Sequence, residues 1–397
     1  MSGWDRRSTF RAAGPQRQSS EEAKGTTTYR YDGLGQLTNG VYPVSPALTL
    51  QYDVLGRLTN LVDGVGQTGY SYVHNRLASE DGPWAEDTVS YSYQQVGPRS
   101  GLTLLQPNAS PWTQSYGYDP AERLTSVVSP AGSFGYTYDG AHVALPGTLT
   151  LPSGATIATS YDFMARLTNA TLRSSQQALL NHHGYGYNAA SQRTSVTNMA
   201  GNTVGYTYDR IGQLTQASGK EANGTTRLNE QFGYGYDAAG NLAQRTNDFA
   251  AAEPLVQTFS ISNALNQLTS VTRSGKLTVA GTTTTNTTSA TVNGVAASRY
   301  GDATFAKDGF TLTNGVNSFT AVAQDAFGRL DTNTVTVNLP ATVSFTYDDN
   351  GNLLSDGRRL LGYDDENQLI TVIVTNGVNN STLSKFAEKA IGSDPYY

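Results

Sequence analysis

Aspartates that directly follow a tyrosine recur along this chain and are its most regular candidates for chemistry. The clearest are Asp32, Asp53, Asp119, Asp162, Asp209, Asp237, Asp348 and Asp364, preceded by Tyr31, Tyr52, Tyr118, Tyr161, Tyr208, Tyr236, Tyr347 and Tyr363. A carboxylate can act as a general acid or base, or bind a metal ion. An active site, however, needs one constellation and not many copies of it. The repetition therefore favours a structural role, in which each carboxylate caps a turn.

Two further groups could bind a metal. Residues 348–352, Asp-Asp-Asn-Gly-Asn, are similar to part of a calcium-binding loop, but a helix–loop–helix site needs its glycine at position six, and Gly351 is at position four. The adjacent His182 and His183 would point to opposite faces of a strand, which is a poor chelate geometry. We therefore expect a turn at residues 348–352 and surface loops at the histidines. The remaining histidines are His74 and His142.

Other catalytic signatures are missing from the sequence. It has no Cys, which excludes disulfides, thiolate zinc sites and Cys nucleophiles. It also has no Gly-x-Ser-x-Gly elbow, His-Glu-x-x-His helix or phosphate-binding loop. We predict a non-enzymatic chain with no catalytic residues, no cofactor and no bound metal. The 24 tyrosines could form a surface on which sugar rings stack, but tyrosines at period two are first of all packing within a sheet.

The elements around the aspartates have the pattern of β-hairpins. In residues 205–215, two tyrosines alternate with a threonine, so both tyrosines share one face of a strand. Asp209 and Gly212 follow at the first and fourth positions of a turn, where a type I turn prefers Asp and Gly. The carboxylate can accept the backbone N–H two residues on, and glycine tolerates the positive φ of a bulge. A three-residue loop closed by such a bulge would place Tyr208 opposite Leu214.

The hairpin unit recurs at spacings of roughly 20 to 28 residues, which is the range of repeat architectures. The glycines at the turn position are Gly35, Gly56, Gly212, Gly240 and Gly351. Weaker copies begin at Tyr72, Tyr93, Tyr138, Tyr187 and Ser262. A short helical turn is also expected at residues 174–180, in a long connection between repeats.

These Tyr-Asp-x-x-Gly-[Arg/Gln/Asn]-Leu-[Thr] cores resemble the YD-repeat family, that is, the RHS-repeat proteins of bacteria and their relatives the teneurins. The cores cover about residues 29–273 and 341–375. The resemblance implies an all-β fold in which tandem hairpins join edge to edge into a long, curved and spiralling sheet, here a partial YD shell. In bacterial members the shell commonly encloses a toxic C-terminal domain. The self-cleaving region that precedes such a toxin has no match in this sequence, so neither self-cleavage nor toxicity is assigned to it.

Composition agrees with a sheet rich in turns. Charged residues make up 15% of the chain, against about 25% in typical soluble proteins. The formal net charge of −6 leaves no electrostatic footprint for DNA or RNA. No window reaches the ~18 apolar residues of a membrane span. We therefore expect neither a nucleic-acid partner nor a membrane span.

The repeat is interrupted between Ser262 and Tyr347. Residues 274–340 have few aromatic residues and consist of alternating Thr- and Val-rich strands with Asn-Gly turns. They resemble the small immunoglobulin-like β-sandwich modules of bacterial surface proteins. The segment is short for a seven-strand sandwich, so six or fewer strands are expected. The turn at Asp325 imitates the repeat turn and is interpreted as the same turn chemistry reused.

The two ends of the chain lack the repeat pattern. Residues 1–28 are interpreted as a disordered leader without the apolar stretch of a secretory signal. Residues 376–397 are interpreted as a tail, with a truncation or frameshift suspected near Phe386.

The preferred hypothesis is a non-enzymatic structural segment of an RHS/YD-repeat protein, forming part of the encapsulating β-shell of a larger protein of the polymorphic-toxin type. We expect it to be secreted or on the cell surface of a bacterium. Its expected partners are further YD-repeat sheet or a C-terminal cargo domain. The alternative is a cell-surface adhesion or carbohydrate-binding module.

Overall fold

The computed structural model describes residues 16–21, 25–142, 144–261, 265–283, 287–375 and 380–385, and every regular element in them is a β-strand. The all-β prediction is therefore confirmed. Within the described residues, no helix is long and apolar enough to cross a membrane. The chain divides into two compact units, Met1–Phe134 with Thr346–Tyr397, and Gly135–Phe345.

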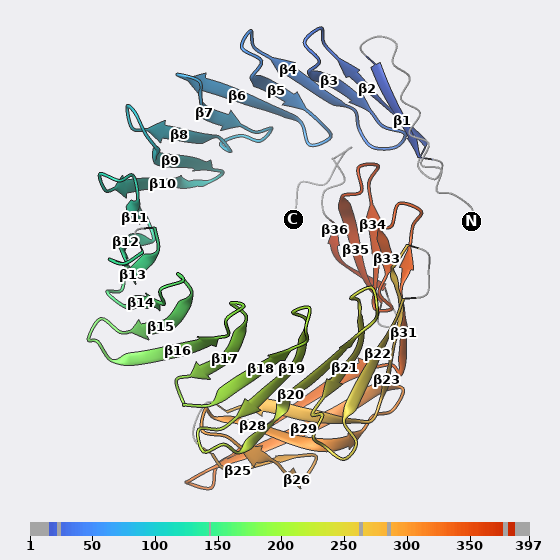
Figure 1. Cartoon of the computed structure of the whole chain (residues 1–397). Helices are drawn as coiled ribbons and strands as arrows, with labels where there is room; N and C mark the ends of the chain where they lie inside the picture. The colour runs from blue at the N-terminus through green and yellow to red at the C-terminus, as the bar shows by residue number, and fades with distance from the viewer. Residues whose placement is uncertain are drawn as a thin grey trace. The chain divides into compact units, whose positions relative to one another are not determined.

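Most strands belong to one 24-stranded sheet (Figure 1). Its strands in the first unit are β1 (Gln16–Glu21), β2 (Gly25–Tyr31), β3 (Leu37–Val41), β4 (Leu48–Tyr52), β5 (Leu58–Val62), β6 (Gln67–Val73), β7 (Arg76–Asp81), β8 (Val89–Tyr93), β9 (Arg99–Gln106), β10 (Ala109–Tyr118), β11 (Leu124–Ser129) and β12 (Gly132–Tyr138), the last of which reaches into the second unit. Those in the second unit are β13 (Pro146–Thr150), β14 (Thr156–Tyr161), β15 (Leu167–Arg173), β16 (Leu179–Tyr187), β17 (Arg193–Asn198), β18 (Thr203–Tyr208), β19 (Leu214–Lys220), β20 (Thr226–Tyr236), β21 (Leu242–Asn247), β22 (Leu255–Ile261), β23 (Leu268–Ser274) and β31 (Thr342–Ser344).

Strands that follow one another in the chain pair antiparallel in both units, as in a succession of hairpins. The sheet is open, with β1 and β31 as its end strands, because β1 pairs with β2 and β31 pairs with β23. The predicted leader contains β1, and β2 begins at Gly25, so the array starts before residue 29. The prediction therefore placed the start of the hairpin array too late in the chain.

Seven strands between β23 and β31 form two small sheets of their own, which we call the insert. A three-stranded sheet has the order β24 (Lys276–Thr282), β28 (Thr304–Thr311), β27 (Ser298–Arg299). A four-stranded sheet has the order β26 (Val295–Ala296), β25 (Thr287–Val292), β29 (Gly315–Asp325), β30 (Leu330–Leu339). The expectation of six or fewer strands was wrong, because β26 and β27 are only two residues long and leave little trace in the sequence.

A five-stranded sheet in the first unit follows the insert and contains β32 (Thr346–Tyr347), β33 (Leu353–Ser355), β34 (Arg359–Tyr363), β35 (Leu369–Thr375) and β36 (Asn380–Lys385). β36 lies in the predicted tail and pairs with β35. The turn after β34 contacts the loop after β3, since the Asp365 carboxylate accepts the backbone N–H groups of Val44 (2.9 Å) and Ser45 (2.7 Å).

The hydrophobic core is small. Buried hydrophobic residues that form a cluster, Ala290, Val292 and Phe305, lie between the two sheets of the insert. Most side chains of the 24-stranded sheet are half-buried or exposed. The sheet therefore depends heavily on its backbone ladders and on the side-chain hydrogen bonds described next.

Candidate functional site: the joint between neighbouring hairpins

The predicted turn at Asp209 has the expected geometry. The Gly212 N–H donates to the Asp209 carbonyl (3.2 Å), and Gly212 has a φ of 92°. The Asp209 carboxylate accepts the N–H of Ile211, two residues on, at 3.0 Å. Tyr208 pairs with Leu214 across a bulge. The predicted hairpin is therefore confirmed at this repeat.

Each of the predicted aspartates makes the same two bonds. One carboxylate oxygen accepts the backbone N–H groups two and four residues on, at 2.8–3.1 Å, in the turns that begin at Asp32, Asp53, Asp119, Asp162, Asp209, Asp237, Asp348 and Asp364. The second of these bonds was not anticipated. The predicted turn glycines all have positive φ: Gly35 (81°), Gly56 (79°), Gly212 (92°), Gly240 (85°) and Gly351 (87°).

The other carboxylate oxygen often bonds the side chain four residues on. Arg57 Nε donates to Asp53 Oδ2 at 2.7 Å, and Asn241 Nδ2 donates to Asp237 Oδ2 at 2.9 Å. The Arg57 side chain is the main cause that holds the pKa of Asp53 below its usual value, and Asn241 does the same for Asp237. These carboxylates are thus stabilised as anions within the turn. At residues 348–352, Asp348 uses both oxygens in this way, which supports a turn there.

In many repeats the tyrosine before the turn also links its hairpin to the preceding one, a contact that the sequence pattern did not predict. The Tyr236 hydroxyl donates to the Leu214 carbonyl at 2.8 Å. The ladder between β19 and β20 begins only at Gln216 and Gly233, so the Leu214 carbonyl lies beyond its end. The hydroxyl therefore satisfies an acceptor that the ladder leaves free, which phenylalanine could not do.

The same hydroxyl contact recurs at hairpins along both units, at 2.7–3.0 Å. Its donor and acceptor pairs are Tyr52 and Leu37, Tyr72 and Leu58, Tyr93 and Leu77, Tyr118 and Arg99, Tyr161 and Pro146, Tyr187 and Leu167, Tyr208 and Arg193, and Tyr236 and Leu214. Three of the weaker copies, at Tyr72, Tyr93 and Tyr187, are therefore joined like the clear ones.

A second side chain links each hairpin to the following one. The residue four positions after the turn aspartate is Gln, Arg or Asn in the clear repeats. Gln36 Nε2 donates to the Gly56 carbonyl at 2.9 Å, and Arg166 donates to the Asn188 carbonyl at 2.9 Å. The Arg166 guanidinium also lies 4.9 Å from the centre of the Tyr187 ring, within cation–π range. We call the tyrosine contact and this contact together the repeat joint.

Some turns have this geometry with altered residues. Ser174 Oγ accepts the N–H groups of Gln176 and Ala178 at 3.2 Å, as an aspartate would. The helical turn expected at residues 174–180 was therefore wrong, because a capped β-turn joins β15 to β16. The turn at Asp325 in the insert also follows the repeat pattern, with bonds to Phe327 and Arg329. The weak copy that begins at Ser262 has residues 262–264 outside the described residues, but its predicted return strand is present as β23, where Leu268 pairs with Ile261 of β22.

The histidines at 182 and 183 lie in β16 and not in a loop, which corrects that expectation. His182 contacts the Thr171 hydroxyl at 3.0 Å, and His183 contacts Asn198 Oδ1 at 2.9 Å. The two rings use different partners on neighbouring strands. No cluster of three His, Cys, Asp or Glu side chains suited to a metal ion occurs among the described residues.

A buried arginine attaches the insert to the sheet. Arg227 on β20 is only 1% exposed, and its guanidinium forms ion pairs with Glu230 (2.8 Å), Asp302 (2.8 Å) and Glu221. It also lies 4.4 Å from the centre of the Tyr300 ring. Burial alone would lower the pKa of Arg227, but hydrogen bonds to the glutamates raise it. We call these five residues the Arg227 cluster.

A buried carboxylate gives the insert a second attachment. Asp248, which is 2% exposed, accepts the Asn229 N–H at 2.7 Å and the hydroxyl of Thr278 on β24. Burial raises the pKa of Asp248. Together, the two attachments bury two ionisable side chains, Arg227 and Asp248, each bonded to a residue of the insert.

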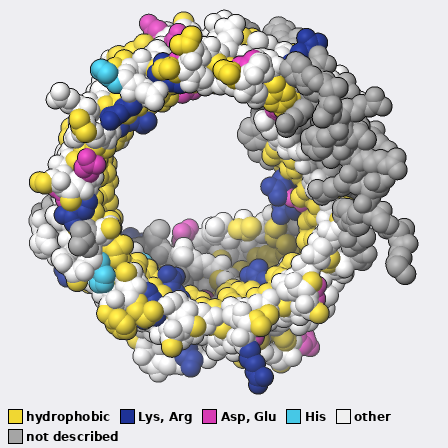
Figure 2. Space-filling view, turned by 45° about the horizontal axis from the view of Figure 1, so that its top comes forward, with side chains coloured by type: hydrophobic (Ala, Val, Ile, Leu, Met, Phe, Trp, Pro, Cys, Tyr) yellow, Lys and Arg dark blue, Asp and Glu magenta, His cyan; other side chains and the backbone are white. Residues whose placement is uncertain are grey.

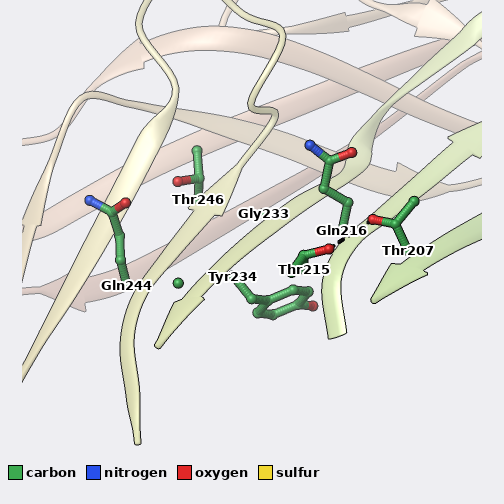
Figure 3. Close-up of a pocket in the computed structure, with 8 residues that line it drawn as sticks. Thr207, Thr215, Gln216, Gly233, Tyr234, Gln244 and Thr246 are labelled. Atoms are coloured by element: carbon green, nitrogen blue, oxygen red, sulfur yellow. Dashed lines mark hydrogen bonds between the residues drawn. The ribbon is translucent and has the colours of Figure 1, made fainter. Parts of the chain in front are cut away.

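A polar hollow of about 520 Å³ lies over strands β18 to β21 (Figure 3). Thr207, Gln216, Gln244 and Thr246 extend into it, and the glycines at 233 and 235 leave the strand between them uncovered. Strand alternation directs the Tyr234 ring to the opposite face from these glycines. The hollow is therefore lined mainly by hydroxyls and amides, with Tyr234 as the aromatic residue in its lining.

Charges are mixed over the surface. On the face drawn in Figure 2, Lys and Arg side chains are scattered among Asp and Glu side chains and hydrophobic ones. A nucleic-acid partner would require a continuous basic stripe. No such stripe is seen on this face, and the absence of a nucleic-acid partner stays a prediction.

No family model matches the sequence, and no curated protein matches it. Solved structures do match. They include TcdB2-TccC3-Cdc42 (TM-score 0.51, 15% identity), TcdB2-TccC3-TEV (TM-score 0.51, 16% identity) and the Photorhabdus luminescens Tc holotoxin pore (TM-score 0.50, 14% identity). The chain has an RHS-like fold. Each match covers 92% of this chain but 21% of the solved chain, so this chain spans about a fifth of the length of the structures it matches.

Proposed function

We propose that this chain is a non-enzymatic structural segment of a larger RHS/YD-repeat protein, in which it forms part of an encapsulating β-shell. The observation that carries the proposal is the repeat joint. The aspartate closes its own turn, and the tyrosine and the Gln or Arg side chain bond the neighbouring hairpins, so the motif as a whole extends a sheet. The similarity in fold to the Tc structures supports the same role.

The predicted motif residues have a structural role under this proposal. Their carboxylates are occupied by backbone N–H groups, and their hydroxyls by carbonyls of the neighbouring hairpin. The expected partners are further YD-repeat sheet or a C-terminal cargo domain of the full-length protein. The proposed location is outside the cell or at the cell surface of a bacterium. The immunoglobulin-like character of the insert also stays a proposal, supported by its two facing sheets.

Protease protection of the full-length gene product tests this function. We expect the segment that follows the repeats to resist an added protease. A variant in which Tyr187, Tyr208 and Tyr236 are all changed to Phe breaks three successive joints and should expose that segment. The matched control changes Tyr185, Tyr206 and Tyr234 to Phe. These tyrosines lie two residues earlier on the same strands, and the structure records no hydroxyl hydrogen bond for them among the described residues.

Two outcomes would contradict the proposal. A segment that is digested equally fast in the unaltered protein and when detached would rule out encapsulation. Equal protection in the two triple variants would show that the joints do not hold the shell together. Carbohydrate binding stays a prediction, and a glycan array is its direct measurement.

A further inference from the structure

The two sheets of the insert do not match in size. One has three strands and the other four, and they pack face to face through Phe305 and Phe310 on one side and Val292 and Phe319 on the other. β24 is the end strand of the smaller sheet, and β30 is the end strand of the larger one. In the described residues, each pairs with a neighbour on one side only. One side of the sandwich is therefore a strand short.

A groove of about 700 Å³ lies between these two end strands. Leu277 and Val279 of β24 line one wall, and Val335 and Val337 of β30 line the other. The floor is formed by Phe319 and other residues of β29. Both walls are strand edges, so the groove offers apolar side chains and unpaired backbone groups together.

The inner face of β30 is open to solvent along most of its length. Strand alternation places Asp331, Asn333 and Val335 on the side that faces the sandwich, yet all three are exposed, Val335 by 54%. The outer residues Thr334 and Thr336 are exposed as well. In a sandwich the inner face of a strand is normally covered by the opposite sheet, and along most of β30 that face is uncovered.

We propose that this groove accepts an extended peptide segment of a partner protein, which adds to β24 as a fourth strand and covers the inner face of β30. Addition of a strand to a sheet edge takes its affinity from backbone hydrogen bonds and its specificity from alternate side chains. The groove selects a segment with apolar residues at every second position. The inference concerns the insert and is independent of the proposed shell.

Charge fixes the orientation of this segment. Asp325 is paired with Arg329 at 2.6 Å, so Asp331 is the carboxylate of the groove lining that has no salt bridge to any described residue. Leu277 pairs with Phe310, which contacts Phe319, the partner of Val335, so the N-terminal end of β24 lies toward Val335. Thr287, which follows β24, pairs with Asp325, so the C-terminal end of β24 lies toward Asp331. A strand antiparallel to β24 would begin at the acidic end. The segment therefore carries a basic residue at its N-terminal end.

The probe is a fluorescein-labelled peptide, Lys-Thr-Val-Thr-Val-Thr-Val-Thr, titrated into the full chain and followed by fluorescence anisotropy. We expect saturable binding that weakens at least tenfold in Val335→Asp, which puts a charge in the groove. Thr334→Asp puts the same charge on the outer face of the same strand and should bind like the unaltered chain. Because residues 334 and 335 are both exposed, neither variant should disturb folding.

A second comparison does not depend on folding. The peptide with Glu in place of Lys should bind several-fold more weakly to the unaltered chain, and this difference should vanish in Asp331→Asn. The inference would be overturned if the peptide showed no saturable binding, or if it bound Val335→Asp and Thr334→Asp equally well. A dimer in sedimentation that Val335→Asp separates, without peptide binding, would overturn it too, because a second copy would then fill the groove.

Discussion

Replacing Arg227 by methionine should loosen the insert from the sheet. Methionine fills much of the same volume but cannot bond the three carboxylates around it. Removing one partner from a buried ion pair costs about 3–5 kcal/mol, since the remaining charge is left in the interior. In this cluster the side chains of Glu221, Glu230 and Asp302 are 19%, 31% and 28% exposed, against 2% for the arginine. Water can therefore reach the carboxylates, and we expect a loss near the lower end, about 3 kcal/mol.

The direction of the pH dependence makes this prediction specific. In the unaltered chain, hydrogen bonds from Thr304 and Arg227 hold the pKa of Asp302 below its usual value, although burial opposes this. That contribution is present above the unfolded pKa of about 3.9 and is lost as the pH falls through the folded pKa. Without Arg227, the burial of Asp302 acts with less opposition and raises the folded pKa of this carboxyl. The variant should therefore gain stability between pH 7 and pH 5, where the unaltered chain changes little.

Tryptic cleavage measured by mass spectrometry reports on the attachment. Cleavage after Lys307, within the insert, should be about a hundredfold faster in Arg227→Met at pH 7, which corresponds to about 3 kcal/mol of opening free energy. Arg210→Met is the matched control, because Arg210 is exposed in a turn of the same unit. Equal cleavage in the two variants, or a loss in Arg227→Met that does not lessen at pH 5, would refute the reasoning.

Three further changes test the repeat itself. Tyr208→Phe should lower the free energy of unfolding by about 1 kcal/mol, the usual worth of one hydrogen bond, whereas Tyr206→Phe should not; urea denaturation compares them, and equal effects would argue against the joint. Gly212→Ala should cost about 1–2 kcal/mol, because alanine is strained at a φ of 92°, whereas Gly33→Ala enters open space and should be near neutral in the same assay. Asp53→Asn should have a lower free energy of unfolding than the unaltered chain, by a constant amount from pH 7 to pH 5. This difference should disappear below about pH 4, because a carboxyl with a lowered folded pKa stabilises the fold only while it is ionised. A difference that persists at pH 3 would show that the charge of Asp53 does not contribute.

Local structure could be predicted from the sequence because it depends on neighbours in the chain. The bonds of Asp209, the φ of Gly212 and the pairing of Tyr208 with Leu214 all lie within one hairpin and follow from turn chemistry. The expected helix at residues 174–180 failed for the same local reason, since Ser174 caps a β-turn as an aspartate does. A serine carries less information than an aspartate about the turn that it begins.

Contacts between hairpins were harder to predict. The hydroxyl of Tyr236 reaches a carbonyl 22 residues earlier, and its acceptor becomes visible only once the strand register is known. A signal was nevertheless present, because the residue four positions after the turn aspartate is restricted to Gln, Arg or Asn, all of which can donate. The Arg227 cluster had no comparable signal. Asp302 stands 75 residues away in a segment of different composition, so only the folded chain brings the two together.

Each repeat joint connects only adjacent hairpins. The gene can therefore gain or lose whole hairpins without disturbing the others. A duplicated or deleted hairpin carries its own turn cap, its backward hydroxyl and its forward amide or guanidinium, so the remaining copies need no compensating substitution. Unequal recombination between the similar repeat codons would then yield folded products whose sheets differ by whole hairpins. The expected variation among related genes is therefore in multiples of two strands, and a sheet that gained or lost a single strand would place its next joint at the wrong edge.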